Sequence, residues 1–246
     1  MNIKRGLKIA GLSLLAVLLI LVASIWMVVG TQSGSQWALA RVPGLQLENF
    51  QGRLGGQWSA DRLLWLQGED RVEVQALAFD WTPGCLLKMT LCIDRLNAEK
   101  VMLHFAPGTE PAKEGPITLP NLTLPLAIQL KDVQLGSLQL DGIEQLRDLR
   151  LAAHWTAQGL QIDSAHLQRD ELVLDLNGLL DPAGDWPLTL DGQLQLPPQD
   201  GKPWTLALDI QGDLLNTLHL KADSSGYLAG VLRESCNRSP NICLLA

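Results

Sequence analysis

Cysteine and histidine are the residues of this chain best suited to redox, metal or acid–base chemistry. The four cysteines form two C-x6-C pairs, Cys85 with Cys92 and Cys236 with Cys243. This spacing suits zinc poorly, because structural zinc sites use closer pairs such as C-x2-C. Two alternatives stay open for Cys85 and Cys92, namely a disulfide that closes a short loop or two buried free thiols.

The histidines give no sign of a catalytic or metal site. Each stands singly in a strand-like stretch, without a second histidine, a cysteine or an acid at ligand spacing: His104, His154, His166 and His219. The chain also lacks a G-x-S-x-G elbow, a P-loop and an H-E-x-x-H motif. We therefore predict a protein that is not an enzyme and that binds no metal and no cofactor.

Composition excludes two broad classes. With 47% hydrophobic and 18% charged residues, the 246-residue chain is too apolar to be disordered. The net charge is −7, and the body lacks the basic clusters that neutralise phosphates, so a nucleic-acid partner is excluded.

An uncharged apolar stretch at residues 9–30 predicts a transmembrane signal anchor, because a helix needs about 20 apolar residues to span a bilayer. Lys4, Arg5 and Lys8 precede it, so residues 1–8 are expected in the cytoplasm and the body on the other side. The alternative is a cleaved signal peptide, although the apolar core of such peptides is usually about 7 to 15 residues long.

After a short helix and linker at residues 31–44, the pattern becomes that of strands. In "LTLDGQLQL", residues 188–196, leucines alternate with polar residues, which gives a strand one aliphatic and one polar face. Similar alternation recurs over residues 45–232, interrupted by a Pro- and Gly-rich loop at 106–121. In residues 71–81 the second half is apolar on both parities, with Leu77, Phe79 and Trp81 on one and Val74, Ala76 and Ala78 on the other, which predicts a strand covered on both faces.

Three arrangements would bury the aliphatic face: a second sheet packed on it, as in a β-sandwich; membrane lipid around a barrel wall; and lipid held in a curled groove. A barrel wall fits poorly with the long anchor and the lack of aromatic girdles. Nearly uniform leucine packs loosely in a compact core, whereas acyl chains need no unique packing. The pattern alone leaves the sandwich and the groove open.

The stretch "GLQLENFQGRLGGQWSADRLLW", residues 44–65, resembles the N-terminal region of the TamB family, which is grouped with AsmA-like and bridge-like lipid-transfer proteins. The resemblance continues through "WTPGCLLKMTLCIDRLNAEKV" and "LTLPLAIQLKDVQLGSLQL" and covers roughly residues 1–232. It implies an all-β fold, a long antiparallel meander curled into a U-shaped hydrophobic groove. It also implies an inner-membrane anchor, a periplasmic body and an outer-membrane partner of the TamA type.

The function that the resemblance implies is transport of phospholipid between the inner and outer membranes. Alternatives are a scaffold for inserting outer-membrane or autotransporter proteins, for which Pro125 hints at an edge strand, and a membrane-tethered β-sandwich without lipid. An oxidising periplasm favours the Cys85–Cys92 disulfide. The groove is expected to be lined by residues that share the aliphatic parity: Leu122, Leu124, Leu126, Ile128, Leu130, Leu149, Leu151, Trp155, Leu172, Leu174, Leu176, Leu188, Leu190, Leu194, Leu196, Leu206, Leu208 and Ile210.

Two features depart from the family. Its members are several times longer than this chain, and residues 233–246, "RESCNRSPNICLLA", abruptly lose the alternation. We expect this stretch to be a frameshifted or foreign tail on an N-terminal fragment.

Overall fold

The structure is a computed structural model that describes residues 3–106, 121–122, 124–237 and 242–245. Side chains are described from residue 14 to residue 235 with the same internal gaps. The side chains of Lys4, Arg5, Lys8, Cys236 and Cys243 and most of the loop expected at 106–121 lie outside this part.

Two helices precede the sheet. α1 (Ile3–Gly30) is followed by α2 (Gln32–Leu39), whose N-terminus is capped by the Thr31 hydroxyl accepting from the Gly34 N–H. Within the residues searched, no single helix is long and apolar enough to span a membrane, whereas Leu14–Gly30 and α2 meet the criterion as a pair bent by 87°. The transmembrane helix expected over residues 9–30 stays a prediction.

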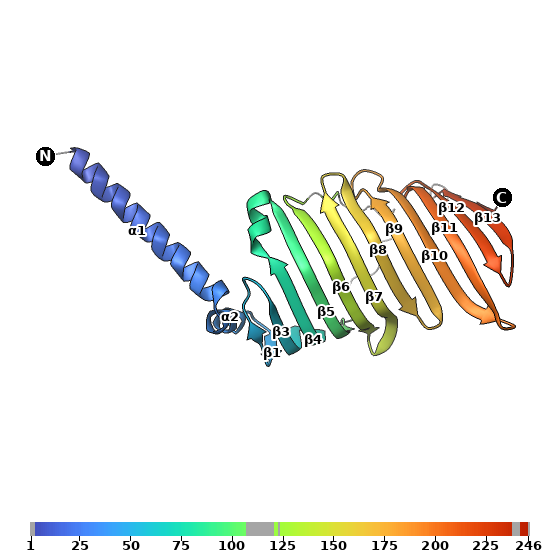
Figure 1. Cartoon of the computed structure of the whole chain (residues 1–246), viewed down its shortest axis with the longest axis horizontal. Coiled ribbons are helices and arrows are strands. Elements are labelled where there is room, and N and C mark those ends of the chain that lie inside the picture. The colour runs from blue at the N-terminus through green and yellow to red at the C-terminus, as the bar shows by residue number, and fades with distance from the viewer. Residues whose placement is uncertain (1–2, 107–120, 123, 238–241, 246) are drawn as a thin grey trace.

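The rest of the described chain forms one open 14-stranded sheet, in which the strands lie side by side in chain order (Figure 1). β2 alone lies off this order and pairs with β3. The strands are β1 (Leu45–Glu48), β2 (Gln51–Gly52), β3 (Trp58–Gln67), β4 (Asp70–Thr82), β5 (Thr90–His104), β6 (Ala127–Leu140), β7 (Ile143–Thr156), β8 (Gly159–Arg169), β9 (Leu172–Leu180), β10 (Pro187–Gln199), β11 (Lys202–Asp213), β12 (Thr217–Gly226), β13 (Gly230–Asn237) and β14 (Ile242–Leu245). A 3-10 helix, η1 (Pro83–Lys88), joins β4 to β5.

The all-β prediction is confirmed, with one departure from a simple meander. Every neighbouring pair of strands is antiparallel except β5 and β6, which are parallel. The residues just before β6 lie against the β9–β10 connection, where the Leu122 N–H donates to the Pro182 carbonyl (2.9 Å) and the Gly184 N–H donates to Asn121 (2.9 Å).

The described strands form a single layer, with no second sheet over the first. In the described part of the chain, substantial contacts between strands occur only between neighbours in the sheet. The two-sheet sandwich that the sequence left open is therefore not formed. Few apolar side chains are buried as a consequence, and those described are Phe50, Ala60, Leu77, Cys92, Ala153, Leu188 and Ala222.

A line of interrupted pairing crosses strands β3 to β7. Asp61, Ala76, Glu99, Gly136 and Asp148 occupy successive positions on this line, and none is paired with its neighbour on the next strand. Ala76 and Asp148 have positive φ angles of 51° and 49°. An unpaired residue of this kind shifts the alternation of a strand by one.

The shift explains why residues 71–81 are apolar on both parities. The prediction that this strand is covered on both faces is wrong, because Val72 and Val74 precede Ala76 while Leu77 and Phe79 follow it in the other phase. In each of the strands β3 to β7, the apolar residues on one side of this line have one parity and those on the other side have the opposite parity. The residues on the two sides are Trp58 and Ala60, then Leu63 and Trp65 in β3; Leu77 and Phe79, then Val72 and Val74 in β4; Leu96 and Ala98, then Val101 and Leu103 in β5; Val133 and Leu135, then Leu138 and Leu140 in β6; and Leu149 and Leu151, then Leu146 in β7. One face of the sheet thus stays apolar across the line.

Candidate functional site

An unbroken row of apolar residues and one glycine crosses eleven strands on one face of the sheet. Residues paired directly across neighbouring strands lie on the same face, so the row can be followed from pair to pair. It runs through Trp58, Phe79, Leu96, Val133, Leu151, Ala165, Leu176, Gly192, Leu208, Ala222 and Leu232.

A second row on this face ends at a carboxylate. It runs through Trp81, Ile93, Leu130, Ala153, Ile162, Gly178, Leu190, Ile210, Leu220 and Glu234. Glu234 lies in β13, within the stretch in which the sequence loses its alternation. We call the surface that carries both rows the apolar face.

Fifteen of the eighteen residues expected to line a groove lie in strands on the apolar face. The other three, Leu122, Leu124 and Leu126, precede β6, and the first two are each 44% exposed. Pro125 also precedes β6, a strand paired on both sides, so the expected edge strand is wrong. That these side chains contact lipid stays a prediction.

Sequence reasoning missed the part of the apolar face that lies in β3 to β5. Trp58, Phe79 and Leu96 belong to the first row, yet they show no long alternation because the line of interrupted pairing divides their strands. The change of apolar parity at Ala76 was a signal that could have revealed them.

No described helix or strand forms a second layer over the apolar face. Its side chains are mostly half-buried against neighbours in the same layer, and several are more open, including Leu172 (36%), Trp65 (37%) and Leu232 (45%). An extended exposed apolar surface of this kind marks a site for another molecule.

The opposite face is polar and carries the histidines, which have no partner at ligand spacing in the sequence. His166 Nδ1 lies 2.7 Å from Asp175, His154 Nδ1 lies 3.1 Å from Asp163, and His104 Nδ1 lies 2.6 Å from an oxygen of Asp141. These partners come from neighbouring strands or the following turn, so only the strand register reveals them. Among the residues searched, no group of three His, Cys, Asp or Glu could hold a metal ion.

A buried carboxylate ties the first strands of the sheet together. Glu73 on β4 accepts from Arg62 Nε on β3 (2.8 Å) and from Arg71 (2.6 Å), and its side chain is 8% exposed. The hydrogen bond from Arg62 is the main cause that lowers the pKa of Glu73 to about 2. Arg62 also bonds Glu48 (3.1 Å), which links β1 to the same group.

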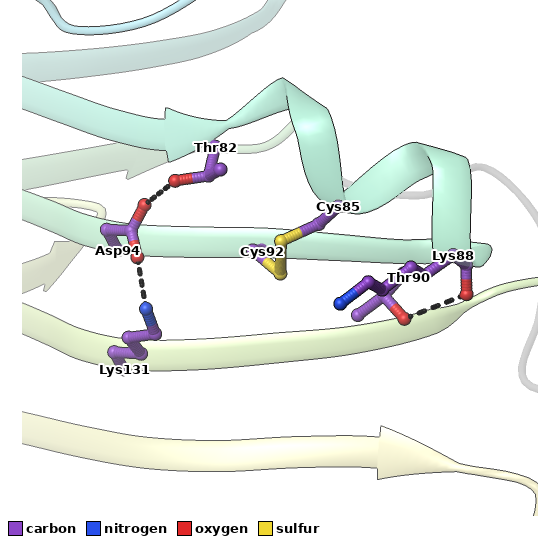
Figure 2. The surroundings of a disulfide bond; sticks show 7 residues. All are labelled: Thr82, Cys85, Lys88, Thr90, Cys92, Asp94 and Lys131. Atoms are coloured by element: carbon purple, nitrogen blue, oxygen red, sulfur yellow. Dashed lines mark hydrogen bonds and ion pairs between the residues drawn. A yellow bond between two sulfur atoms is a disulfide. The ribbon is translucent and has the colours of Figure 1, made fainter.

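A disulfide joins Cys85 in η1 to Cys92 in β5, with 5.9 Å between the Cα atoms (Figure 2). Next to it, Asp94 accepts from Thr82 (2.6 Å) and from Lys131, and the bond from Lys131 is the main cause that lowers the pKa of Asp94. These bonds link the ends of β4, β5 and β6. The turn that the disulfide closes carries Leu87, which is 93% exposed.

Two overlapping stretches of the chain, residues 20–168 and 110–237, match the family model described as TamB, N-terminal domain. The chain belongs to the TamB family. Together the two matches cover most of the chain, including all the strands from β1 to β13. No curated protein and no solved structure matches the chain.

Membership places the chain in a family of non-enzymatic transport and assembly proteins, those of the translocation and assembly module. TamB proteins are anchored in the inner membrane, with the body in the periplasm. The feature of this chain that needs a functional account is the apolar face, over which no described helix or strand forms a second layer.

Proposed function

We propose that this chain is the membrane-proximal part of a phospholipid conduit, in which acyl chains cover the apolar face and lipid moves between the inner and outer membranes. The observation that carries the proposal is the first apolar row, which crosses eleven strands without a polar side chain. An outer-membrane TamA-type protein is the expected partner at the far end.

Lipid fits this face better than a protein partner does. Each methylene of an acyl chain gains about 0.8 kcal/mol when it leaves water, wherever along an aliphatic surface it lies. The rows offer leucine and alanine at nearly equivalent positions in successive strands, so a tail can shift from strand to strand without losing contact. A protein partner would instead require particular shapes at particular strands.

The second part of the proposal is that α1 is a retained anchor. A 28-residue helix is about 42 Å long, more than the roughly 30 Å of a bilayer core. Its described apolar side chains are exposed around the helix, for example Leu14 (73%), Ile20 (66%) and Met27 (66%), and need a lipid cover. Lys4, Arg5 and Lys8 precede them, which favours a cytoplasmic N-terminus.

Photocrosslinking in cells tests the conduit. A benzophenone amino acid at Leu190 or Leu206, on the apolar face, should capture phospholipid. The same group at Gln193 or Thr205, on the polar face, is the matched control and should capture none. Equal capture from both faces, or none from either, would overturn the conduit.

An open sheet also has unpaired edges, and the alternative function is a scaffold that offers an edge to a folding outer-membrane or autotransporter protein. A scaffold of this kind would crosslink to nascent barrel strands from β1, the first edge, and would not need lipid on the apolar face. The same benzophenone series extended to exposed Gln46 on β1 separates the two functions.

A further inference from the structure

The two helices meet almost at a right angle. α2 starts two residues after α1 ends, and the bend between them is 87°. A helix at this angle to a membrane-spanning helix runs along the membrane surface. The sequence of α2, "QSGSQWAL", suits such a position, because its glutamine and serine side chains are too polar for the hydrocarbon core.

One side of α2 is fastened to the sheet. Gln32 and Gln36 both donate to the Phe50 carbonyl (3.3 Å each). Ser35 is fully buried, and its hydroxyl accepts from the Leu54 N–H (2.9 Å) while it donates to the Val28 carbonyl of α1 (3.2 Å). These bonds hold α1, α2 and the start of the sheet in one arrangement.

A different side of α2 faces the region that α1 occupies. A Cβ atom on Gly34 would collide with the backbone of Met27 and Val28, so this side of Gly34 is turned towards α1. Trp37 follows Gly34 at three residues, a position on the same side of α2, and Arg41 lies two residues beyond the end of the helix. The Arg41 guanidinium carbon lies 3.6 Å from the centre of the Trp37 ring, and Trp37 is 55% exposed.

The charge of this pair is positive, and Arg41 forms no ion pair with the described residues. Between residues 9 and 47 Arg41 is the only charged residue, and the first acid of the chain is Glu48, which pairs with Arg62. A guanidinium stacked on an aromatic ring keeps its N–H groups directed outward, where they can bind phosphate. Tryptophan favours the headgroup region of a bilayer.

We propose that α2 lies on the surface of the bilayer that holds α1, with the stacked Trp37–Arg41 pair among the headgroups and Arg41 bound to anionic phospholipid. This inference rests on the proposed anchoring of α1. It gives the first strands of the sheet a fixed height and orientation at the membrane, and it concentrates anionic phospholipid beside β1.

Fluorescence quenching in lipid nanodiscs tests the inference on the full chain. An environment-sensitive nitrobenzoxadiazole group is attached at Ser33→Cys, one turn before Trp37, in a chain that also carries Cys236→Ser and Cys243→Ser. Phospholipids spin-labelled near the headgroup, either phosphatidylglycerol or phosphatidylcholine, serve as quenchers for positions 33 and 46. Phosphatidylcholine spin-labelled in the middle of its acyl chain serves as the quencher for position 20, which lies at the centre of the proposed anchor. The same group at Ile20→Cys in α1 shows whether the anchor is in the bilayer. At Gln46→Cys in β1 it shows the signal of a position exposed to water.

We expect quenching at positions 20 and 33 and none at position 46. Phosphatidylglycerol should quench position 33 more strongly than phosphatidylcholine does, and Arg41→Gln should reduce this preference about fivefold, the factor for one basic residue at an anionic surface. Arg41→Lys should keep most of it.

The alternative outcomes separate the inference from the anchor on which it rests. Quenching at position 20 without quenching at position 33 would overturn the placement of α2 and leave the anchor standing. Quenching at position 33 with no effect of Arg41→Gln would overturn the binding of anionic phospholipid. No quenching at position 20 would overturn the anchor and this inference together.

Discussion

Leu194 of β10 lies directly opposite Leu206 of β11 on the apolar face, while the adjacent residues Gln193 and Ala207 lie opposite each other on the polar face. Neighbouring positions of the same two strands thus offer a test and its control with almost identical backbone surroundings. This relationship gives the first prediction.

If lipid covers the apolar face, phospholipid should copurify with the wild-type chain, and Leu194→Asp combined with Leu206→Asp should remove most of it. An unpaired carboxylate against acyl chains costs several kcal/mol per site. The paired control, Gln193→Asp with Ala207→Asp, should keep wild-type lipid because both positions are exposed on the other face. Lipid extracted from each purified variant is measured by mass spectrometry, and equal loss in the two variants would argue against the assignment of faces.

Gly136→Val should destabilise the sheet by about 2 kcal/mol or more, the usual cost of forcing an atom into close-packed surroundings. A Cβ atom at Gly136 would collide with the carbonyl of Glu99, on the line of interrupted pairing. Gly84→Ala is the control, since no atom lies near its Cβ position. Denaturant unfolding measures both, and a stable Gly136→Val variant would mean that β5 and β6 do not approach as described.

Glu73→Gln should lower the free energy of unfolding by about 2 kcal/mol at neutral pH, because it weakens the charged hydrogen bonds that this carboxylate accepts from Arg62 and Arg71. The pKa of Glu73 is lowered to about 2 in the folded chain, so its stabilising effect is complete above its ordinary pKa of 4.5 and is lost as the pH falls from there towards 2. The difference between wild type and variant should therefore shrink over this range. Glu48→Gln, at an exposed partner of Arg62, should have little effect at any pH.

Cys85→Ser combined with Cys92→Ser should lower the free energy of unfolding by about 2.5 kcal/mol. The disulfide closes a loop between residues separated by 7 positions, and it therefore restricts the unfolded chain. The loss should match that caused by reductant on the wild-type chain, measured by thermal unfolding. A reductant that leaves the wild type unchanged would show that the bond is absent in solution.

The alternation in the sequence was sufficient to predict the strands from β9 to β12 and the side of each that is apolar, because leucine recurs there at every second residue with few interruptions. The alternation did not reveal the apolar side of the strands from β3 to β5, because its phase shifts by one residue at Ala76 and at Glu99. It also could not reveal that β5 and β6 are parallel, because the direction of a neighbouring strand does not change which residues alternate.

The histidines show the same limit. His166 and Asp175 are nine residues apart on different strands, and they meet only because β8 and β9 pair in one particular register. Sequence spacing describes neighbours along a strand, whereas a site on a sheet is assembled across strands. The apolar face itself was predictable in outline, but its continuity across eleven strands required the register.

The central claim is that lipid lies along the whole apolar row. A series of benzophenone substitutions tests it most directly, with one at Phe79, one at Leu151 and one at Leu208, each compared with its neighbour on the polar face, Ala78, Arg150 and Ala207. The conduit predicts that phospholipid is captured in cells at all three row positions and at none of the three neighbours. Capture at Phe79 alone, or equal capture from both faces, would contradict a continuous lipid path along the sheet.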